Sequence, residues 1–520
     1  MKDWKLAVAI VALTAIAVVR VSLAQRHFSA THDEPAHIAS GYEWLTGTYT
    51  LDPSHPPLAR VIGALPLWLD ANPARPQQGN FIDRANDLLY RGAYETNLGR
   101  ARRGTLVFLA IAIAGVAILA RRVFSRAIAV IAAALFATLP PILGHAGLVT
   151  TDMAVVSALP WALIALDVFL AKPTLLRGAL LGVAIAFGVL AKFSFLVYFA
   201  PAALIILWSA GRFGRHITAW AVAVLVAFLA VWVGYRFQLQ SASSVVGDGT
   251  WVFMKLLVPQ TIAQRAANVP FPAVSLPIGL AMVRAHNESP TNVSFLLGEI
   301  GGPWREYFPI VLFYKTPIAF TILFAWGLFV LKGKRERALA IIALAILAAA
   351  MTSRINIGVR HVLPFYVPAS IVAAVAVMKI WERASSLFSR AALAALLAWL
   401  FVGAALAHPD YLSWFNEAAG PEPSQIVVDS NLEWGQDGLR LARAVREMQI
   451  ERLQILYATN IRLAEHGVNA EKLTFGPKQG WIAIGEAPLR FFHEPEMYGW
   501  LERYRPVRKV GKSIRLYYIE

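Results

Sequence analysis

The arrangement of apolar residues constrains this chain more than any other feature of its sequence. Long segments that are almost free of charge recur along it, and several reach the ~20 residues that a helix needs to cross the ~30 Å apolar layer of a bilayer. Charged residues make up only 15% of the 520-residue chain, whereas soluble proteins contain about 25%. We therefore predict a polytopic α-helical membrane protein with about eleven spans. The apolar segments are residues 5–24, 104–120, 127–144, 153–171, 178–191, 195–210, 217–235, 306–331, 338–352, 363–380 and 391–407.

Basic residues in the short loops predict how these spans are oriented, because short cytoplasmic loops are rich in Lys and Arg. With a cytoplasmic N-terminus and about eleven spans, every basic short loop falls on the cytoplasmic side. The first apolar segment follows Lys2 and Lys5, as the core of a signal peptide would, but it is too long for such a core, and we expect a membrane anchor. The basic loop residues are Arg121, Arg122, Arg126, Lys172, Arg177, Arg212, Arg215, Lys332, Lys334, Arg335, Arg337, Arg383 and Arg390.

The net charge of +16 raises the question of a nucleic-acid partner. Orientation signals and attraction to anionic lipid headgroups account for most of the excess. No sustained basic stretch with interleaved aromatic residues occurs outside the apolar segments. We therefore expect membrane lipids and no nucleic acid as partners. The chain has no Cys, which excludes disulfides and thiolate sites.

The predicted topology divides the chain into a membrane module, residues 1–407, and a C-terminal part, residues 408–520, outside the cytoplasm. Two long loops of the module, residues 25–103 and 236–305, lie on the same outer side. In the C-terminal part, short apolar runs alternate with a helical pattern, which predicts a small α/β domain. The predicted strands are residues 424–429, 452–458, 480–484 and 513–519, and the predicted helix is 434–448.

Two apolar stretches of the second long loop, residues 251–258 and 274–285, have two interpretations. They could lie in the membrane interface as amphipathic helices. They could equally form a buried flap, and the sequence favours neither interpretation.

Residues 31–37, THDEPAH, crowd ionisable groups where the chain leaves the first span. Pro35 favours the first turn of a helix, which an adjacent carboxylate could cap. A cap explains one carboxylate but not the neighbouring ionisable residues, so a structural and a functional role are equally supported. Carboxylate and imidazole groups could also hold a divalent metal ion. The candidate metal ligands are Asp33, Glu34, His37 and Asp152.

Residues 55–60, HPPLAR, place two prolines between His55 and Arg60. One interpretation is a rigid turn from which Arg60 reaches toward lipid headgroups. The other places Arg60 beside the phosphate of a bound lipid.

Residues 150–152, TTD, come between the third and fourth spans. A single Asp beside Thr is most often a helix cap. The predicted topology nevertheless brings Asp152 to the same outer face as Asp33. Two carboxylates on one face are what general-base or metal-assisted chemistry needs.

Basic residues recur on that outer face, next to the ends of the spans. Ionisable groups in or near the membrane are costly and usually face a cavity. Because Arg and Lys bind phosphate well, the set predicts a phosphate site, although each residue alone is more often a membrane anchor. The candidates are Lys192, Lys315, Arg360 and His361.

Residues 429–437, DSNLEWGQD, surround one aromatic ring with polar groups. Hydrogen-bonding side chains beside an aromatic plate are typical of sugar sites, and a capped strand-to-helix turn is the equally supported alternative. The candidate sugar- or acceptor-binding residues are Asp429, Asn431, Glu433, Trp434, Gln436 and Asp437.

Several of these motifs, taken in order, resemble bacterial glycosyltransferases of the C-type membrane superfamily. The resemblance is to the family related to protein O-mannosyltransferases and to lipid A aminoarabinose transferases. It extends over most of the chain, and the pairing of DEPAH with HPPL is its most specific part. The motifs are THDEPAH (31–37), GYEWLTGTY (41–49), HPPLAR (55–60), TTDMA (150–154), RHVLPFY (360–366) and DSNLEWGQD (429–437).

This resemblance implies an inverting transfer of a sugar from a polyprenyl-phosphate carrier, outside the cytoplasm at the bacterial inner membrane. It implies a protein, lipid or glycan as acceptor, and it implies catalytic roles for Asp33, with Glu34 beside it, and for Asp152. The basic residues it associates with the carrier phosphate are Arg60, Lys192, Arg360 and His361, to which position suggests adding Lys315. His37 and His55 are further candidates for acceptor or sugar binding.

A transporter or flippase of lipid-linked sugars is the competing class, because it would use a similar basic cavity. Transporters often contain repeated halves and broken helices, and neither is evident in the sequence. The large outer loops and the C-terminal part favour an enzyme. A non-catalytic scaffold that binds glycans leaves THDEPAH without a role.

Overall fold

All eleven predicted apolar segments are helical in the computed structural model, which describes residues 3–47, 52–70, 81–211, 216–246 and 259–520. Six of these helices are long and apolar enough to cross a membrane, or eight if each of two bent pairs counts as one span. The helices are α1 (Asp3–Gln25), α5 (Tyr94–Val123), α6 (Arg126–Thr138), α7 (Pro140–Ala146), α8 (Asp152–Ala171), α9 (Leu175–Ala191), α10 (Ser194–Ala210), α11 (Ile217–Gly234), α16 (Tyr307–Lys315), α17 (Ile318–Val330), α18 (Lys334–Ala350), α19 (Tyr366–Arg383) and α20 (Leu387–Leu406).

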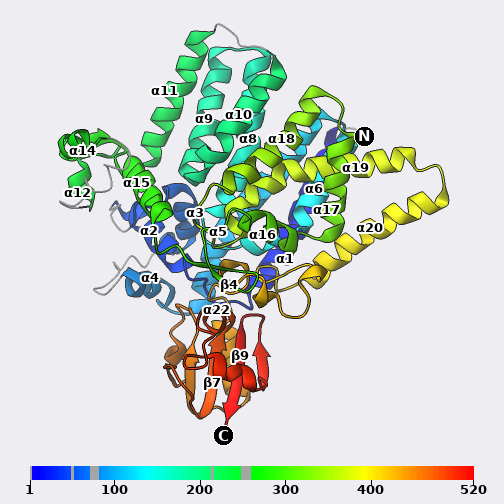
Figure 1. Ribbon diagram of the computed structural model, residues 1–520. Coiled ribbons are helices and arrows are strands. Elements are labelled where there is room, and N and C mark those ends of the chain that lie inside the picture. Colours follow the sequence, from blue (N-terminus) through cyan, green and yellow to red (C-terminus); the bar gives the residue numbers. More distant parts are fainter. Residues whose placement is uncertain (1–2, 48–51, 71–80, 212–215, 247–258) are drawn as a thin grey trace.

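Burial separates central from peripheral helices. The most apolar windows of α8 and α19 are 78% and 89% buried, whereas those of α1 and α11 are 11% buried. Helix α20 projects from the body of the molecule (Figure 1) and leaves Leu387 and Phe388 more than four-fifths exposed. Apolar side chains exposed along whole helices are expected where a protein faces lipid. The protein is therefore an integral membrane protein with α8 and α19 at its centre.

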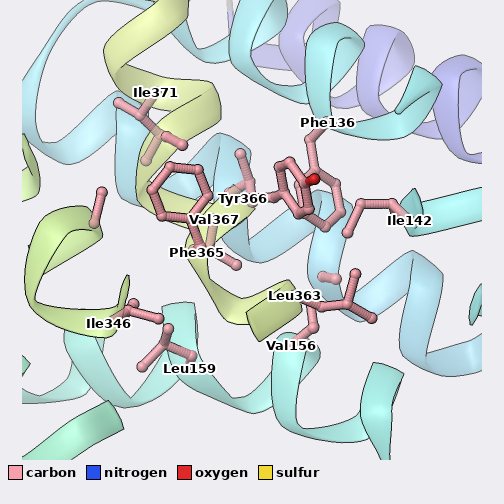
Figure 2. Packing of buried hydrophobic residues seen from close by; sticks show 14 of the residues in the cluster. Phe136, Ile142, Val156, Leu159, Ile346, Leu363, Phe365, Tyr366, Val367 and Ile371 are labelled. Atoms are coloured by element: carbon pink, nitrogen blue, oxygen red, sulfur yellow. The ribbon is translucent and has the colours of Figure 1, made fainter. Parts of the chain in front are cut away.

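The central core also fixes the position of the 3-10 helix η2 (Val359–Phe365), which leads into α19. Figure 2 shows Leu363 of η2 close to Val156 of α8 and to Ile142 of α7, and η2 contacts both helices. These side chains are fully or almost fully buried. Because interiors pack densely, this contact holds the start of η2 beside the N-terminus of α8.

Two of the basic short loops meet at the end of the bundle opposite to Asp152. Near the C-terminal end of α8, the Asp167 carboxylate accepts hydrogen bonds from Arg122 of α5 and Arg335 of α18. Asp152 begins the same helix at its other end. The end of α10, the start of α11 and the C-terminal end of α8 lie away from the C-terminal sheet, at the other end of the molecule (Figure 1). The two faces inferred from charge are therefore physically separate.

The C-terminal part contains a five-stranded mixed sheet in the order β6-β5-β7-β9-β8. Strand β5 pairs parallel with β6 and β7, and β9 pairs antiparallel with β7 and β8. Three of the four predicted strands are confirmed. The elements are α21 (Gly438–Glu447), β5 (Leu453–Leu456), β6 (Ala470–Lys472), β7 (Gly480–Gly485), α22 (Glu486–Phe491), β8 (Arg508–Val510) and β9 (Ile514–Ile519).

The predicted strand at residues 424–429 is wrong. The structure has two short 3-10 turns there, η4 (Pro423–Gln425) and η5 (Asp429–Asn431). Val427 between them is buried in the core of the membrane helices rather than in the sheet. An apolar run of this length does not distinguish a strand from a segment that packs under helices.

The two long loops fold against the module and against each other. In the first loop, α2 (Glu34–Thr46) packs on α3 (Pro57–Trp68), and α4 (Phe81–Leu89) packs on α2. In the second loop, α15 (Ser275–Glu288) packs so tightly that a Cβ on Gly279 would lie 2.1 Å from the Pro53 carbonyl oxygen. This contact supports the flap interpretation for residues 274–285. Residues 251–258 lie outside the described part of the chain. The remaining short elements of the second loop are β1 (Leu239–Gln240), α12 (Ala242–Val246), α14 (Gln260–Ala266), β2 (Phe271–Pro272), β3 (Ser294–Leu296) and β4 (Glu299–Gly301).

Candidate functional site

Two carboxylates and two cations from distant parts of the sequence meet at the end of the bundle where α8 begins. Arg360 Nη1 donates a hydrogen bond to Asp33 Oδ2 at 3.1 Å and lies 4.0 Å from Asp152 Oδ2. Lys192 Nζ donates to the other oxygen of Asp152 at 2.5 Å. Asp152 is fully buried, whereas the Asp33 side chain is 30% exposed. Asp33 is thus the carboxylate of this cluster that a solvent-side ligand can reach.

Local structure explains why these four residues converge. Asp33 precedes α2, Asp152 begins α8, Lys192 follows α9, and Arg360 lies in η2. Each therefore lies at an element boundary on the same side of the bundle. A carboxylate at a helix N-terminus is also favoured by the helix dipole, which suits Asp152.

The motif at 429–437 contributes one aromatic ring and one carboxyl group to this cluster. The Arg360 guanidinium lies 4.3 Å from the centroid of the Trp434 ring, a cation–π contact. Burial raises the pKa of Asp429 to about 6, against the opposing effect of Arg360. Asp429 therefore changes charge near neutral pH, within the electrostatic reach of Arg360 and Asp33.

The other polar residues of this motif are used within the fold. Asn431 accepts a hydrogen bond from the Val359 amide and donates one to the Tyr307 hydroxyl, both at 2.9 Å. The Gln436 side chain bonds to the backbone of its own loop, and Asp437 bonds to Arg440 and Ser513. Asn431 thus joins this loop to η2 and α16, whereas Gln436 and Asp437 stabilise the C-terminal part itself.

Glu433 is also buried in the fold, where its Oε2 accepts a hydrogen bond from the Ala487 amide at 2.8 Å. Burial raises the pKa of Glu433 to about 8. The side chain does not take part in the contacts between Arg360, Asp33 and Asp152.

Glu34 turns away from Asp33 into the protein. Its carboxylate accepts two hydrogen bonds from Arg102, at 2.7 and 2.8 Å, and both side chains are almost fully buried. It also accepts from the Thr31 amide and, at 3.0 Å, from the Val149 amide. Glu34 therefore joins the segment before Asp33 to the segment before Asp152, which is a positioning role rather than a place in the cluster.

Arg60 is buried and engaged by its own loop. Its guanidinium donates to the Asp52 carboxylate, to the backbone carbonyl of His55 and, at 3.0 Å, to Nδ1 of His37. Burial opposes ionisation of Asp52, but Arg60 outweighs it and the pKa of Asp52 lies well below its usual value. Burial and Arg60 together hold the pKa of His37 well below its usual value, so His37 is neutral and accepts from Arg60. These contacts make Arg60 and His37 a rigid support of the first loop.

The charges of the cluster also act on His55 and His361. Burial lowers the pKa of His55, on which the charge of Lys192 also acts. His361 follows Arg360 in η2, where the charges of Lys192, Arg360 and Asp152 act on it, and the Tyr198 hydroxyl donates to its backbone carbonyl. Both imidazoles are therefore within electrostatic reach of the cluster.

Lys315 bonds to the C-terminal part. Its buried ammonium donates to the backbone carbonyls of Leu412 at 2.8 Å and Asn431 at 2.7 Å, and it lies 4.2 Å from the centroid of the Phe415 ring. Donors directed at carbonyls are satisfied without phosphate. The structure thus gives Lys315 a role in joining the two parts of the chain.

The four candidate metal ligands do not form one group. Within the described residues, no three His, Asp or Glu side chains come together as a metal site. Glu34 binds Arg102, His37 accepts from Arg60, and Arg360 lies between the two aspartates. The carboxylates of this arrangement are paired with cationic side chains.

Arg102 and His145 are notable residues that the sequence pattern did not single out. Arg102 lies in a basic stretch just before the second predicted span, 104–120, and His145 directly follows the third, 127–144. A charged or titratable side chain next to the end of a predicted span was the available signal in both cases.

One protein-family model matches part of this chain. The family model described as dolichyl-phosphate-mannose-protein mannosyltransferase matches residues 96–288, which contain Asp152 and Lys192. Comparison with curated protein sequences yields no significant match.

Among solved structures, ArnT from Cupriavidus metallidurans in the apo state is 13% identical, with a TM-score of 0.50 over 98% of this chain and 97% of that chain. The same protein bound to undecaprenyl phosphate gives a TM-score of 0.48. The apo oligosaccharyltransferase of Archaeoglobus fulgidus is 15% identical, with a TM-score of 0.47 over 77% of this chain and 56% of that chain. The chain thus spans little more than half the length of the archaeal protein. The chain therefore resembles the dolichyl-phosphate-mannose-protein mannosyltransferase family over residues 96–288 and shares the fold of ArnT over 98% of its length.

Proposed function

We propose that the protein transfers a sugar from a polyprenyl-phosphate carrier to an acceptor hydroxyl, with inversion at the anomeric carbon. The observation that carries the proposal is the cluster in which Arg360 contacts Asp33 and approaches Asp152, which Lys192 also binds. It combines a reachable carboxylate with two fixed cations, as such a reaction requires.

In this reaction the acceptor oxygen attacks the anomeric carbon, and the bond from that carbon to the carrier phosphate breaks. The phosphate leaves with the bonding electrons, so negative charge grows on its oxygen. Arg360 and Lys192 would stabilise that charge electrostatically. Asp33 would take the proton of the acceptor hydroxyl as general base. A single displacement of this kind inverts the configuration.

Asp152 serves in this proposal as the residue that positions both cations. Its two oxygens lie 2.5 Å from Lys192 Nζ and 4.0 Å from Arg360 Nη1. Because it is fully buried, a role in contact with a large acceptor is less suited to it than to Asp33.

For the carrier, undecaprenyl phosphate is the first compound to test, because ArnT from Cupriavidus metallidurans binds it. We further infer about eleven spans, with the cluster and residues 408–520 on the extracytoplasmic side of a bacterial inner membrane. The separation of the Asp167 contacts with Arg122 and Arg335 from the Asp152 end of α8 supports this orientation. The acceptor class, whether protein, lipid or glycan, is left to the assay.

The proposal is tested with purified protein in lipid nanodiscs and undecaprenyl-phosphate sugars that carry a radiolabel in the sugar. Wild-type protein should move the label onto an acceptor from a panel of peptides, glycolipids and oligosaccharides. Asp33→Asn should abolish transfer without loss of expression, whereas the matched control Asp70→Asn, at an exposed acid, should leave it intact.

Full activity of the Asp33→Asn variant would remove Asp33 as the base. The alternative hypothesis, that the protein is a flippase, is tested in sealed vesicles with the same lipids. Movement of intact labelled lipid across the bilayer, without cleavage of the sugar–phosphate bond, would overturn the enzymatic proposal.

A further inference from the structure

The corner between α7 and α8, residues 145–152, contains several buried polar atoms that lack hydrogen-bond partners. Buried polar groups are almost always hydrogen-bonded. Yet His145 Nδ1, Thr150 Oγ1 and Asp152 Oδ2 have no hydrogen-bond partner in the described part of the chain. All three side chains are at least 98% buried. Such a concentration in eight residues calls for a ligand.

The neighbours of this corner place it inside the proposed site. Arg360, whose Nε likewise has no partner among the described residues, lies with Nη1 4.0 Å from Asp152 Oδ2. The charges of Asp152 and Arg360 both act on His145. Trp434 contacts both sides: its ring lies 4.3 Å from the Arg360 guanidinium and 6.1 Å from the His145 ring.

The corner is also held in place. The Val149 amide donates to Glu34 at 3.0 Å, and Glu34 is bound to Arg102. The Gln25 amide donates to the Gly147 carbonyl at 2.7 Å. These hydrogen bonds fix the backbone that carries the polar atoms, so the atoms keep their positions although they lack protein partners.

The hydrogen-bond donors and acceptors among these atoms indicate which chemical group would bind to them. Arg360 Nε can only donate and an ionised Asp152 oxygen can only accept, while the Thr150 hydroxyl and His145 Nδ1 can match either partner. A phosphate oxygen cannot donate to Asp152, and an apolar group would leave every atom unpaired. A hydroxyl both donates and accepts, so it can donate to Asp152 and accept from two of the other three groups.

We propose that His145, Thr150 and the free oxygen of Asp152 form a subsite that binds a hydroxyl group of the donor sugar, with His145 as a specificity-determining residue. The inference rests on the proposed function and specifies which part of the substrate these three residues recognise. The carrier phosphate would lie on the Lys192 side of Asp152.

Substitutions of His145 test which atom matters. An Asn amide places a polar atom near the position of Nδ1, a Gln amide places it near Nε2, and Leu removes it at similar volume. We expect His145→Asn to lose least, and His145→Gln and His145→Leu to lose on the order of tenfold in kcat/KM, the scale of one buried hydrogen bond. Thr150→Val, which keeps the shape of the side chain, should give a similar loss. His493→Leu, at an exposed site in the C-terminal part, is the matched control.

The decisive measurement compares the labelled undecaprenyl-phosphate sugar with its monodeoxy analogues. The wild-type protein should prefer the hydroxylated donor to one of these analogues. In His145→Leu this preference should be about tenfold smaller, because removing the sugar hydroxyl and removing the imidazole abolish the same contact. Melting temperatures are measured for each variant alongside.

An unchanged donor preference in both His145→Leu and Thr150→Val would overturn the inference and leave the transferase intact. Equal losses in His145→Asn and His145→Leu would overturn it too, because the residue would then act through its shape. A wild-type protein that transfers no sugar would instead overturn the proposed function, and the inference with it.

Discussion

The substitution Glu34→Gln separates the roles of the two adjacent carboxylates in THDEPAH. Glu34 accepts hydrogen bonds from Arg102 at 2.7 and 2.8 Å, from the Thr31 amide at 2.8 Å and from the Val149 amide at 3.0 Å. Gln has the same size but no charge, and its amide nitrogen would face donors. Removing one partner of a buried ion pair costs about 3–5 kcal/mol. We expect a loss of that size in the free energy of unfolding.

The assay is equilibrium unfolding in mixed micelles with increasing SDS, followed by Trp fluorescence. Replacing both partners, as in Glu34→Leu with Arg102→Leu, should cost less than Glu34→Gln alone, because no buried charge is left unpaired. Glu382→Gln is the matched control: Glu382 pairs with Lys379 on the surface, where both side chains are at least 43% exposed. An exposed pair contributes about 0–1 kcal/mol.

One result would refute this reasoning. If Glu34→Gln unfolds at the same SDS concentration as the wild-type protein yet transfers no sugar, Glu34 acts in the chemistry and not through the fold. A stability loss together with partial activity is the outcome expected for a residue that positions Asp33 and Asp152.

Three further predictions concern the cluster, the C-terminal part and the flap. Arg360→Ala should lower kcat/KM for the lipid donor roughly 10- to 150-fold, the equivalent of about 1.5–3 kcal/mol for a hydrogen bond to a charged group. Unchanged donor kinetics, measured beside the exposed control Arg354→Ala, would remove Arg360 from the phosphate site. Burial raises the pKa of Glu433 in the native state to about 8, so the unfolded state loses this proton at lower pH. Protonated Glu433 therefore stabilises the fold fully only in acid, and this contribution is lost as the pH rises from about 4 to 8. Glu433→Gln should therefore flatten unfolding free energy against pH across this range, and an unchanged slope would exclude Glu433 as its source. Gly279→Ala should displace α15, because its Cβ would lie 2.1 Å from the Pro53 carbonyl oxygen. Proteolysis of the loop that contains α15 should then be faster than in the control Gly99→Ala, whose added Cβ would meet only open space. Equal rates of proteolysis would contradict this packing.

The sequence pattern alone determined the class of protein and much of its helix content. Apolar segments of bilayer length cannot fold any other way in lipid, since every backbone polar group there needs an internal partner. Periodicity likewise identified β5, β7 and β9. It misplaced a strand at residues 424–429, because the burial of Val427 under the membrane helices depends on contacts far away in the sequence.

Only the tertiary structure decided which of the candidate residues belong together. In the sequence, Asp33 and Glu34 are equivalent neighbours, and Arg60, Lys192, Lys315 and Arg360 are equivalent cations. Folding directs Asp33 toward Arg360 and Glu34 toward Arg102, and it places Lys315 on backbone carbonyls. The physical reason is that the direction of a side chain, and the partner that satisfies its charge, depend on which helices pack against each other. Hydropathy predicts that these helices form, but their contacts determine the site.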